Sequence, residues 1–445
     1  MWLVRLVVAG SFRGYEVVGR EKLRPGPRLV VCNHFGGLVD PIVAIWALGG
    51  MPNILAKSTL FERLPLRLAL RLLGVIPVYR AVDVADTSQN VSSFTAVHDA
   101  LRRGRSVLIF PEGTVTDEQR LLPIRTGAAR IVLGAKAAGI EGVTIVPIGI
   151  TYEDKVSARS RVLVEIGDAI AVDEVAPRVL GGGPLAEENH HAVDALTGVI
   201  ADRLQRVSPD YGSLVREAEM MKLANVHLRT DWADPFRDPS VADLRTVAQA
   251  LAHVPAEKAD PAIDRVGRYV LAVEAAGLSD DAITPRPGIG DLAKLILRSA
   301  LILLLASPLV IFGLAANIVP LLAVLAVGSA VAEPVTKGTA RIIAALVLFP
   351  VSWAILIWLT GVRGWGILLV GVVLAVASVA VVASLQLVFE LGEAILRWRQ
   401  VRGRRALLDD LAERRTDAEA ALGALVASTG VRRALLSADD LGPLT

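Results

Sequence analysis

The chain has 445 residues, of which 53% are hydrophobic and 21% charged, with a formal net charge of +2 and a mean hydropathy of +0.52. So small a charge gives no electrostatic reason to expect nucleic-acid binding, and no Lys/Arg block stands interleaved with aromatic residues. The single cysteine, Cys32, excludes an intrachain disulfide framework and zinc sites built on cysteine pairs, and favours a cytoplasmic setting for the polar part of the chain.

The first ten residues, MWLVRLVVAG, hold a basic residue inside a short apolar run. No long apolar region leads to a small-residue cleavage site, so we expect this segment to be retained. A helix here would place Trp2, Leu3, Leu6 and Val7 on one face. Two interpretations stay open: a helix at the membrane surface, or a helix that packs on the following domain.

Strand-like and helix-like patterns alternate from residue 27 to residue 167. This alternation predicts an α/β domain with a mostly parallel sheet flanked by helices. In such domains functional residues collect in loops beyond the strand ends. Strands are expected at 27–34, 75–78, 106–110, 143–150 and 161–167, and helices at 41–48, 92–103 and 125–138.

A Gly-rich connector, residues 181–184, lies in a region with one further helix, and residues 210–290 read as charged helices without a recognisable motif. We therefore divide the chain into a domain at 1–205 and a helical subdomain or lid at 206–290. An α-helical transmembrane domain at 291–396 and a charged helical tail at 397–445 follow. A solvated helix is the expectation for that tail, with contact to anionic lipid as the alternative.

The transmembrane part contains two apolar blocks, residues 299–332 and 342–389. A membrane-spanning helix needs about 20 apolar residues, so the second block suits two spans around the turn at 361–366. Basic residues flank both blocks, which by the positive-inside rule predicts two hairpins. A re-entrant form of the first hairpin stays open. A single tilted first helix is the alternative, giving two to four spans in all.

His34 and Asp40 flank a flexible loop that contains Gly36 and Gly37. If Asp40 accepts the Nδ1 hydrogen of His34, the other ring nitrogen is free to act as a general base. Backbone N–H groups near Gly36 and Gly37 are candidates for an oxyanion site. A histidine near an aspartate is nevertheless most often an ordinary loop residue.

Two further loops carry polar groups after strands. FPEGT, residues 110–114, offers Glu112 for hydroxyl binding and Gly113 for close backbone approach, and Arg80 ends GVIPVYR. Arg80 and Arg125 are candidates to bind a phosphate, Arg125 at the start of a helix. Each loop alone is more simply an ordinary turn or a surface arginine.

The order NHxxxxxD, GVIPVYR, FPEGT and IVPIGI resembles the four blocks of the glycerophospholipid acyltransferase family, over about residues 15–170. The resemblance implies that His34 is the catalytic base and that Asp40 orients it. It also assigns Arg80, Glu112, Gly113 and Thr114 to the acceptor. The fourth block falls on 145–150, with its proline at Pro147.

The chain departs from the common family pattern at two places. Five residues, not four, separate His34 from Asp40, which resembles a long-loop subset with a hydrophobic C-terminal extension. Val115 stands where many members have a basic residue, and Arg125 is the candidate to replace that phosphate contact.

The resemblance implies a membrane-bound enzyme that moves a fatty acyl chain from acyl-CoA or acyl carrier protein to glycerol-3-phosphate or 1-acylglycerol-3-phosphate. The donor is a co-substrate, and no cofactor, metal or nucleic acid is expected. The implied location is the cytoplasmic membrane, multi-pass, with the catalytic domain facing the cytoplasm. Another lipid or sugar acceptor and a non-catalytic membrane scaffold or lipid-transfer protein are the alternatives. A transporter is weaker still, because the apolar blocks hold few ionisable residues.

Overall fold

The structure is a computed structural model that describes residues 1–62, 64–79, 90–116, 120–153, 160–181, 184–186, 189–208, 214–230, 234–286, 288–330 and 334–429. It divides into two compact units, Met1–Ser213 and Leu214–Thr445. We describe each unit by itself.

The first unit is built on an eight-stranded sheet, in which β7 and β8 run antiparallel to β6 and all other neighbours are parallel. The order is β1-β7-β6-β2-β5-β3-β4, with β8 paired to β6. This confirms the predicted mostly parallel sheet. The strands are β1 (Gly14–Val18), β2 (Arg28–Cys32), β3 (Asn53–Lys57), β4 (Ile76–Val78), β5 (Ser106–Ile109), β6 (Thr144–Tyr152), β7 (Arg161–Ile166) and β8 (Ile170–Ala171).

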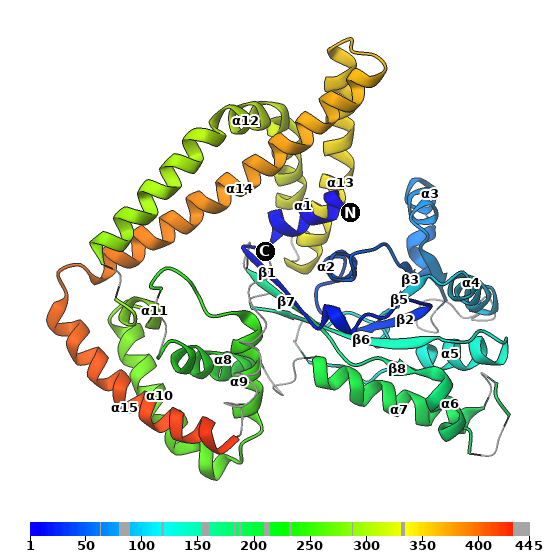
Figure 1. The fold of residues 1–445 in the computed structure, drawn as a ribbon, viewed down its shortest axis with the longest axis horizontal. Helices are drawn as coiled ribbons and strands as arrows, with labels where there is room; N and C mark the ends of the chain where they lie inside the picture. The colour runs from blue at the N-terminus through cyan, green and yellow to red at the C-terminus, as the bar shows by residue number, and fades with distance from the viewer. Residues whose placement is uncertain are drawn as a thin grey trace. The chain divides into compact units, whose positions relative to one another are not determined.

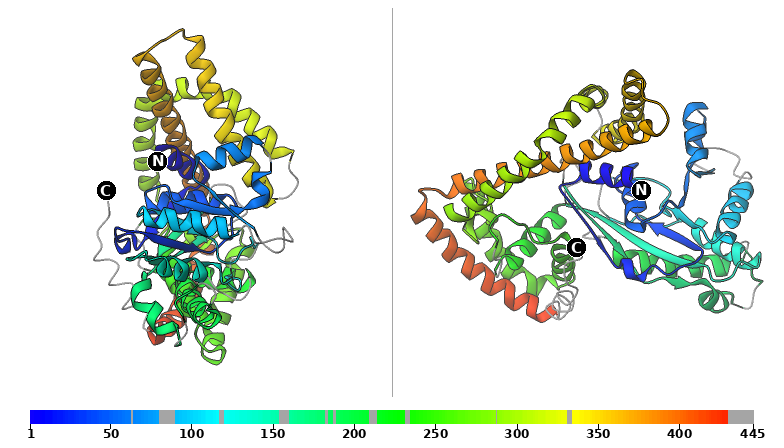
Figure 2. Two further views of the ribbon diagram at one scale, coloured as in Figure 1. Left: turned by 90° about the vertical axis from the view of Figure 1, so that its right-hand side faces the viewer. Right: turned by 45° about the horizontal axis from the view of Figure 1, so that its top comes forward.

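Helices cover both faces of the sheet (Figures 1 and 2). The helices of this unit are α1 (Trp2–Ser11), α2 (Val39–Leu48), α3 (Leu64–Leu72), α4 (Asn90–Arg102), α5 (Gly127–Ala137), α6 (Val172–Val179) and α7 (His190–Val207), with short 3-10 turns η1 (Arg20–Lys22) and η2 (Ser58–Phe61).

The alternation of side chains along β2 shows how the sheet divides the core. Leu29 and Val31 join a cluster formed with α4, α5, α6 and α7, whereas Val30 and Cys32 join a second cluster formed with α1 and α2. All four side chains are fully buried, as expected for a central strand whose two faces are both covered.

The N-terminal helix α1 packs on this domain. Val8 and Phe12 lie in the second core cluster and are 1% and 6% exposed. The structure thus supports domain packing for this end of α1. The side chains of Trp2, Leu3 and Leu6 are outside the described part, so the membrane-surface interpretation stays a prediction.

The second unit consists of helices in the part of it that the structure describes. A smaller group precedes and follows three long apolar helices. The bounds are α8 (Leu214–Leu228), α9 (Val241–Ala252), α10 (Ala256–Ala275), α11 (Asp280–Ile283), α12 (Ile289–Ser329), α13 (Pro334–Leu359), α14 (Trp365–Val401) and α15 (Arg405–Thr429).

Among the described residues, α12 and α14 are long and apolar enough to cross a membrane, and many of their apolar side chains are exposed, with Leu305 at 74% and Leu369 at 67%. Exposed leucines along a helix are costly in water and favourable in lipid. This pattern indicates membrane association. The second apolar block forms two helices, α13 and α14, on either side of the turn at 360–364.

The predicted two-helix hairpin in the first apolar block is wrong. Residues 289–329 form one continuous helix, α12, which bends within its length (Figure 1). Pro308 and Pro320 lie inside it, and each removes a backbone donor without ending the helix. The structure thus has the single first helix given as the alternative, and the number of membrane crossings stays a prediction.

A polar side chain joins the three apolar helices. The Oδ1 atom of Asn317 in α12 accepts a hydrogen bond from Trp353 Nε1 of α13 at 2.7 Å, and its Nδ2 donates to Ser378 Oγ of α14 at 3.0 Å. In an apolar surrounding such bonds fix how helices pack.

The end of α14 is held by acidic side chains of the smaller helical group. Arg397 lies 2.6 Å from Asp281 and 3.2 Å from Asp238, which also pairs at 2.6 Å with the buried Arg229, the residue after α8. Arg397 is only 13% exposed in its side chain. The apolar helix α14 is therefore joined to α11 and to the segment between α8 and α9 by ion pairs that are largely removed from water.

The expectation of a solvated helix for the tail does not hold for α15. Leu411 and Leu422 are buried, and Arg415 is 2% exposed and bonds to Asp280 at 2.9 Å. The burial of α15 could not be predicted from its charged sequence, because Arg415 is buried only together with its partner Asp280. Residues beyond Thr429 lie outside the described part.

The packing of β6 against α7 makes a prediction about Gly149. A Cβ added there would lie 1.7 Å from the carbonyl oxygen of Val207, so Gly149→Ala must displace the end of α7. We expect a loss of at least ~3 kcal/mol of unfolding free energy, measured by denaturant titration. The matched control is Gly198→Ala, at an exposed position in α7 where no atom lies within 4 Å of the added Cβ. It should stabilise by about 0.5–1 kcal/mol. Equal stability of Gly149→Ala and the wild type would contradict this packing.

Candidate active site

The site begins where β2 ends. Asn33 is fully buried and pairs with the backbone of Ile150 in β6, donating from Nδ2 to the carbonyl at 2.9 Å and accepting at Oδ1 from the N–H at 2.7 Å. The side chain replaces a backbone partner that β6 would otherwise lack at this point. Asn33 therefore fixes the position from which His34 leaves the sheet.

His34 and Asp40 form a hydrogen-bonded pair. Asp40 lies in the first turn of α2 and is completely buried, and its Oδ2 atom lies 2.8 Å from His34 Nδ1. The side chain of His34 is 17% exposed. With the proton on Nδ1, the Nε2 atom carries a lone pair, and it has no hydrogen-bond partner among the described residues. The structure thus brings together the two residues predicted to be catalytic.

Asp40 accepts two further hydrogen bonds. The backbone N–H of Gly36 donates to Oδ2 at 2.8 Å, and the hydroxyl of Tyr152 donates to Oδ1 at 2.5 Å. Tyr152 is the last residue of β6 and is 3% exposed. The sequence analysis missed it, although Tyr152 stands two residues after the fourth block; a hydroxyl at the carboxyl end of a central strand was the available signal.

The structure corrects the role expected for Gly36. Its N–H is used by Asp40, so it is not available to bind an oxyanion. A Cβ at this position would lie 2.6 Å from Asp40 Oδ1 and 2.7 Å from the Tyr152 hydroxyl, which explains the glycine. Gly37 has a φ of 61°, and its N–H remains the predicted oxyanion donor.

Glu112 ties the histidine loop to the segment after β5. Its Oε1 atom accepts from the backbone N–H of His34 at 2.8 Å, and its Oε2 accepts from that of Leu122 at 3.0 Å. Glu112 is 2% exposed, and burial raises the pKa of its carboxyl to about 7. These contacts give Glu112 a positioning role in the His34 loop, and its expected contact with acceptor hydroxyls stays a prediction.

The remaining predicted acceptor residues lie around Gly113. Gly113 has a φ of 70°, and an added Cβ would lie 2.9 Å from Arg125 Nε, an atom that donates to the Glu112 carbonyl at 3.3 Å. Thr114 and Arg125 are exposed. Arg125 lies two residues before α5 rather than at its first position. Arg80 lies outside the described residues.

An aromatic ring limits the orientation of the imidazole. Phe110 stacks on His34 with 4.1 Å between ring centroids and an interplanar angle of 21°. One face of the histidine is thereby covered.

Cys32 is close to His34 in sequence but is not placed to react. It is fully buried in β2, and burial, with the charges of Asp40 and Glu112 adding to it, raises the pKa of its thiol well above the usual range. A buried thiol that resists ionisation is a poor nucleophile.

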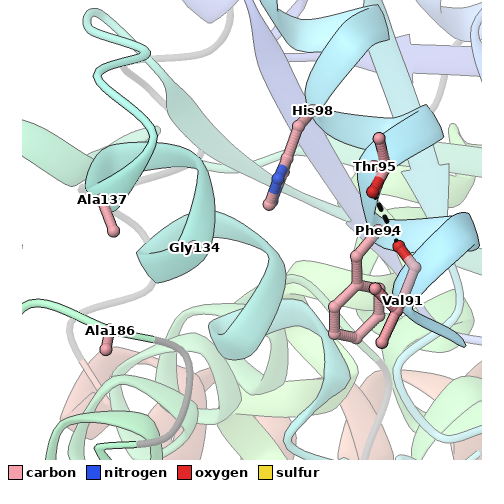
Figure 3. Close-up of a pocket in the computed structure, with 7 residues that line it drawn as sticks. All are labelled: Val91, Phe94, Thr95, His98, Gly134, Ala137 and Ala186. Carbon is pink, nitrogen blue, oxygen red and sulfur yellow. Dashed lines mark hydrogen bonds between the residues drawn. The ribbon is translucent and has the colours of Figure 1, made fainter. Parts of the chain in front are cut away.

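A shallow pocket of about 270 Å³ lies elsewhere, between α4 and α5 (Figure 3). His98 faces it and bonds to the carbonyl of Ile131 at 2.9 Å. None of the predicted site residues lines this pocket. Among the described residues, no group of three or more His, Cys, Asp and Glu side chains is placed to hold a metal ion.

The His34–Asp40 pair lies beyond the carboxyl end of the parallel strand β2. Residues 14–151 match the family model named Acyltransferase. This region is an acyltransferase domain of the glycerophospholipid acyltransferase family, as the sequence motifs predicted.

The curated relatives include glycerol-3-phosphate O-acyltransferase 2 of Saccharomyces cerevisiae, 35% identical over 135 residues that make up 29% of this chain and 18% of the yeast protein. The chloroplastic 1-acyl-sn-glycerol-3-phosphate acyltransferase BAT2 of Brassica napus is 29% identical over 143 residues, 32% of this chain and 38% of that protein. The match thus spans only 18% of this yeast protein and 22% of a second one, glycerol-3-phosphate O-acyltransferase 1 of Saccharomyces cerevisiae.

A solved structure, the 1-acyl-sn-glycerophosphate acyltransferase PlsC from Thermotoga maritima, is 17% identical and covers 44% of this chain and 78% of its own. The TM-score is 0.29. Because this score is low, the fold is assigned from the sheet topology described above.

The buried Glu112 makes stability depend on pH in a defined direction. Burial raises the pKa of Glu112 from 4.5 to about 7, so the folded state binds this proton more tightly than the unfolded state. The resulting stability is complete below about pH 4.5 and is lost as pH rises through about 7. Because Glu112→Gln cannot ionise, the melting temperature of the variant relative to wild type should rise between about pH 5 and about pH 8.

The control is Glu153→Gln. Burial opposes ionisation of Glu153, but hydrogen bonds and charge from Arg161 and Arg13, at 2.6 Å and 2.9 Å, lower its pKa below 4.5. Its stabilising effect is therefore present above about pH 4.5 and lost only as pH falls below that. The melting-temperature difference for Glu153→Gln should stay constant from about pH 5 to about pH 8. A constant difference for Glu112→Gln as well would refute the assignment.

Proposed function

We propose that this protein transfers a fatty acyl chain from a thioester donor, acyl-CoA or acyl carrier protein, to a hydroxyl of glycerol-3-phosphate or 1-acylglycerol-3-phosphate. The observation that carries the proposal is the His34–Asp40 pair, with Nδ1 bonded at 2.8 Å and Nε2 without a hydrogen-bond partner among the described residues. This is the arrangement a general base requires. The motif order and the relatives support the substrate class.

In the proposed reaction, His34 Nε2 takes the proton of the acceptor hydroxyl as its oxygen attacks the thioester carbonyl carbon. A tetrahedral oxyanion forms and then collapses, the carbon–sulfur bond breaks, and the thiolate takes the proton from the imidazolium. Asp40 keeps the ring oriented and stabilises its charged form. The products are an ester and a free thiol, so atoms and charge balance.

Direct transfer is favoured over a covalent acyl-enzyme. Cys32 is fully buried and its thiol resists ionisation. The sequence also lacks a GxSxG motif of the kind that presents a nucleophilic serine.

Arg125 supports an acceptor that carries a phosphate. Its Nε is held by the Glu112 carbonyl, whereas its terminal nitrogens have no hydrogen-bond partner among the described residues. An exposed guanidinium oriented in this way can bind a phosphate with two parallel hydrogen bonds. An acceptor without phosphate, such as a sugar or another lipid, leaves this group unused.

The exposed apolar surface of α12 and α14 suits an enzyme whose long-chain donor and product partition into a bilayer. We propose a multi-pass protein of the cytoplasmic membrane with its catalytic domain on the cytoplasmic side. A membrane scaffold or lipid-transfer role does not require a histidine, an aspartate and a glutamate in this bonded arrangement.

The first test is acyl transfer by the detergent-solubilised full chain with palmitoyl-CoA or palmitoyl-acyl carrier protein, offered glycerol-3-phosphate and 1-acylglycerol-3-phosphate. We expect transfer to one acceptor, with His34→Ala reducing kcat by about 10²–10⁴-fold. The matched variant Cys32→Ser should retain activity within a few-fold. Loss of activity in Cys32→Ser while the protein stays folded would favour a covalent intermediate. A folded protein that acylates neither acceptor would overturn the proposal.

The role of Arg125 is tested by Arg125→Ala. Losing a charge-assisted hydrogen bond to the phosphate should raise KM for the phosphorylated acceptor by about tenfold or more, with little change in KM for the acyl donor. Arg103→Ala, an exposed arginine after α4, is the control and should change neither constant. An unchanged acceptor KM in Arg125→Ala would remove Arg125 from the phosphate site.

A further inference from the structure

We infer that Tyr152 is a positioning residue for the His34–Asp40 pair: by donating its hydroxyl hydrogen to Asp40 Oδ1, it limits how strongly the buried carboxylate stabilises the imidazolium form of His34. This inference rests on the proposed function. Nothing in the four sequence blocks pointed to it, because Tyr152 lies beyond the fourth block.

Both carboxylate oxygens of Asp40 accept hydrogen bonds. Its Oδ2 accepts from His34 Nδ1 and from the Gly36 N–H, both at 2.8 Å, and its Oδ1 accepts from Tyr152 at 2.5 Å. Asp40 is 0% exposed. Water does not reach the carboxylate of Asp40. The tyrosine hydroxyl therefore supplies the hydrogen bond that water gives to an exposed carboxylate oxygen.

The ring of Tyr152 is held from its other side. Phe12, the residue after α1, stacks on it with 5.9 Å between centroids and an interplanar angle of 23°. Both side chains belong to the core cluster that includes Cys32 and Ile150. The ring of Tyr152 is therefore packed in the apolar core beside the His34–Asp40 pair.

The groups that surround the pair determine the sign of the effect. Cys32 of β2, Glu112 after β5 and Tyr152 of β6 are the titratable neighbours whose charge interactions with the pair the structure shows. Burial, followed by the charge of Asp40, raises the pKa of Tyr152 well above its usual range. The phenol therefore stays neutral and remains a donor at every pH at which the enzyme works.

A carboxylate that accepts three hydrogen bonds attracts a neighbouring imidazolium less strongly than a carboxylate that accepts only two. If the tyrosine hydroxyl is removed, Oδ1 is left buried without its donor, and the carboxylate stabilises the protonated form of His34 more strongly. The acid limb of the pH profile of the variant is therefore expected at higher pH. A purely structural tyrosine has no such effect.

The test compares Tyr152→Phe with wild type in pH profiles of kcat/KM, using the full chain and the acceptor identified above. Tyr152→Phe keeps the ring and its stack on Phe12 but loses the hydroxyl. The midpoint of the acid limb should move up by about half to one pH unit. The kcat value should fall by about three- to thirty-fold, with both KM values within about twofold, because Tyr152 touches neither substrate.

The control is Phe12→Leu, which weakens the ring stack and keeps the hydroxyl. It should lower the melting temperature and leave the acid-limb midpoint unchanged. An unchanged midpoint and an unchanged kcat in Tyr152→Phe would overturn the inference and leave Tyr152 as a packing residue.

A second readout separates failure of this inference from failure of the proposed function. With ¹³C-labelled histidine, the His34 resonance is assigned among the six histidines by its absence in His34→Ala, and its titration is followed by NMR without substrate. We expect the titration midpoint to be higher in Tyr152→Phe than in wild type. If no acceptor is acylated, this shift still tests the inference. Identical titrations would refute it even in an active enzyme.

Discussion

A carboxylate without contact to solvent lies beneath His34, and the arrangement of the site follows from the need to stabilise it. Burying an unpaired charge costs several kcal/mol, so Asp40 is tolerated only with His34, Gly36 and Tyr152 all donating to it. These donors come from the end of β2, from the loop before α2 and from the end of β6. The same three hydrogen bonds therefore hold the loop closed, orient the imidazole and join the two central strands beyond their ladder.

Glu112 is stabilised in a similar way. It is another buried carboxylate, and it also accepts backbone N–H groups, from His34 and Leu122. Residues far apart in the chain are thereby connected around one histidine. In contrast to Asp40, Glu112 lies behind the backbone of His34 and not beside its ring. Asp40 thus contacts the imidazole of His34, whereas Glu112 contacts the backbone of the loop.

Much of this arrangement was predictable from the sequence, for reasons that differ between its parts. The strands β2, β5 and β6 are apolar on both faces and read clearly, and the pair His34–Asp40 follows from the motif. Tyr152 and the true partners of Glu112 were not predictable, because they depend on which strands become neighbours and on the register between them. Likewise Pro308 and Pro320 suggested a break in α12, yet a helix in an apolar environment keeps its remaining hydrogen bonds and bends instead.

The ion pairs at Arg397 have a mechanical consequence. α14 is a continuous helix from Trp365 to Val401, and near its end Arg397 is bound to Asp238 and Asp281 of the smaller helical group. An α-helix transmits tilt and axial displacement along its length with little bending, and low-exposure ion pairs are costly to separate. The helical group is therefore coupled to the tilt of α14. In the membrane location proposed above, a change in lipid thickness that tilts α14 must also move α11 and the segment between α8 and α9.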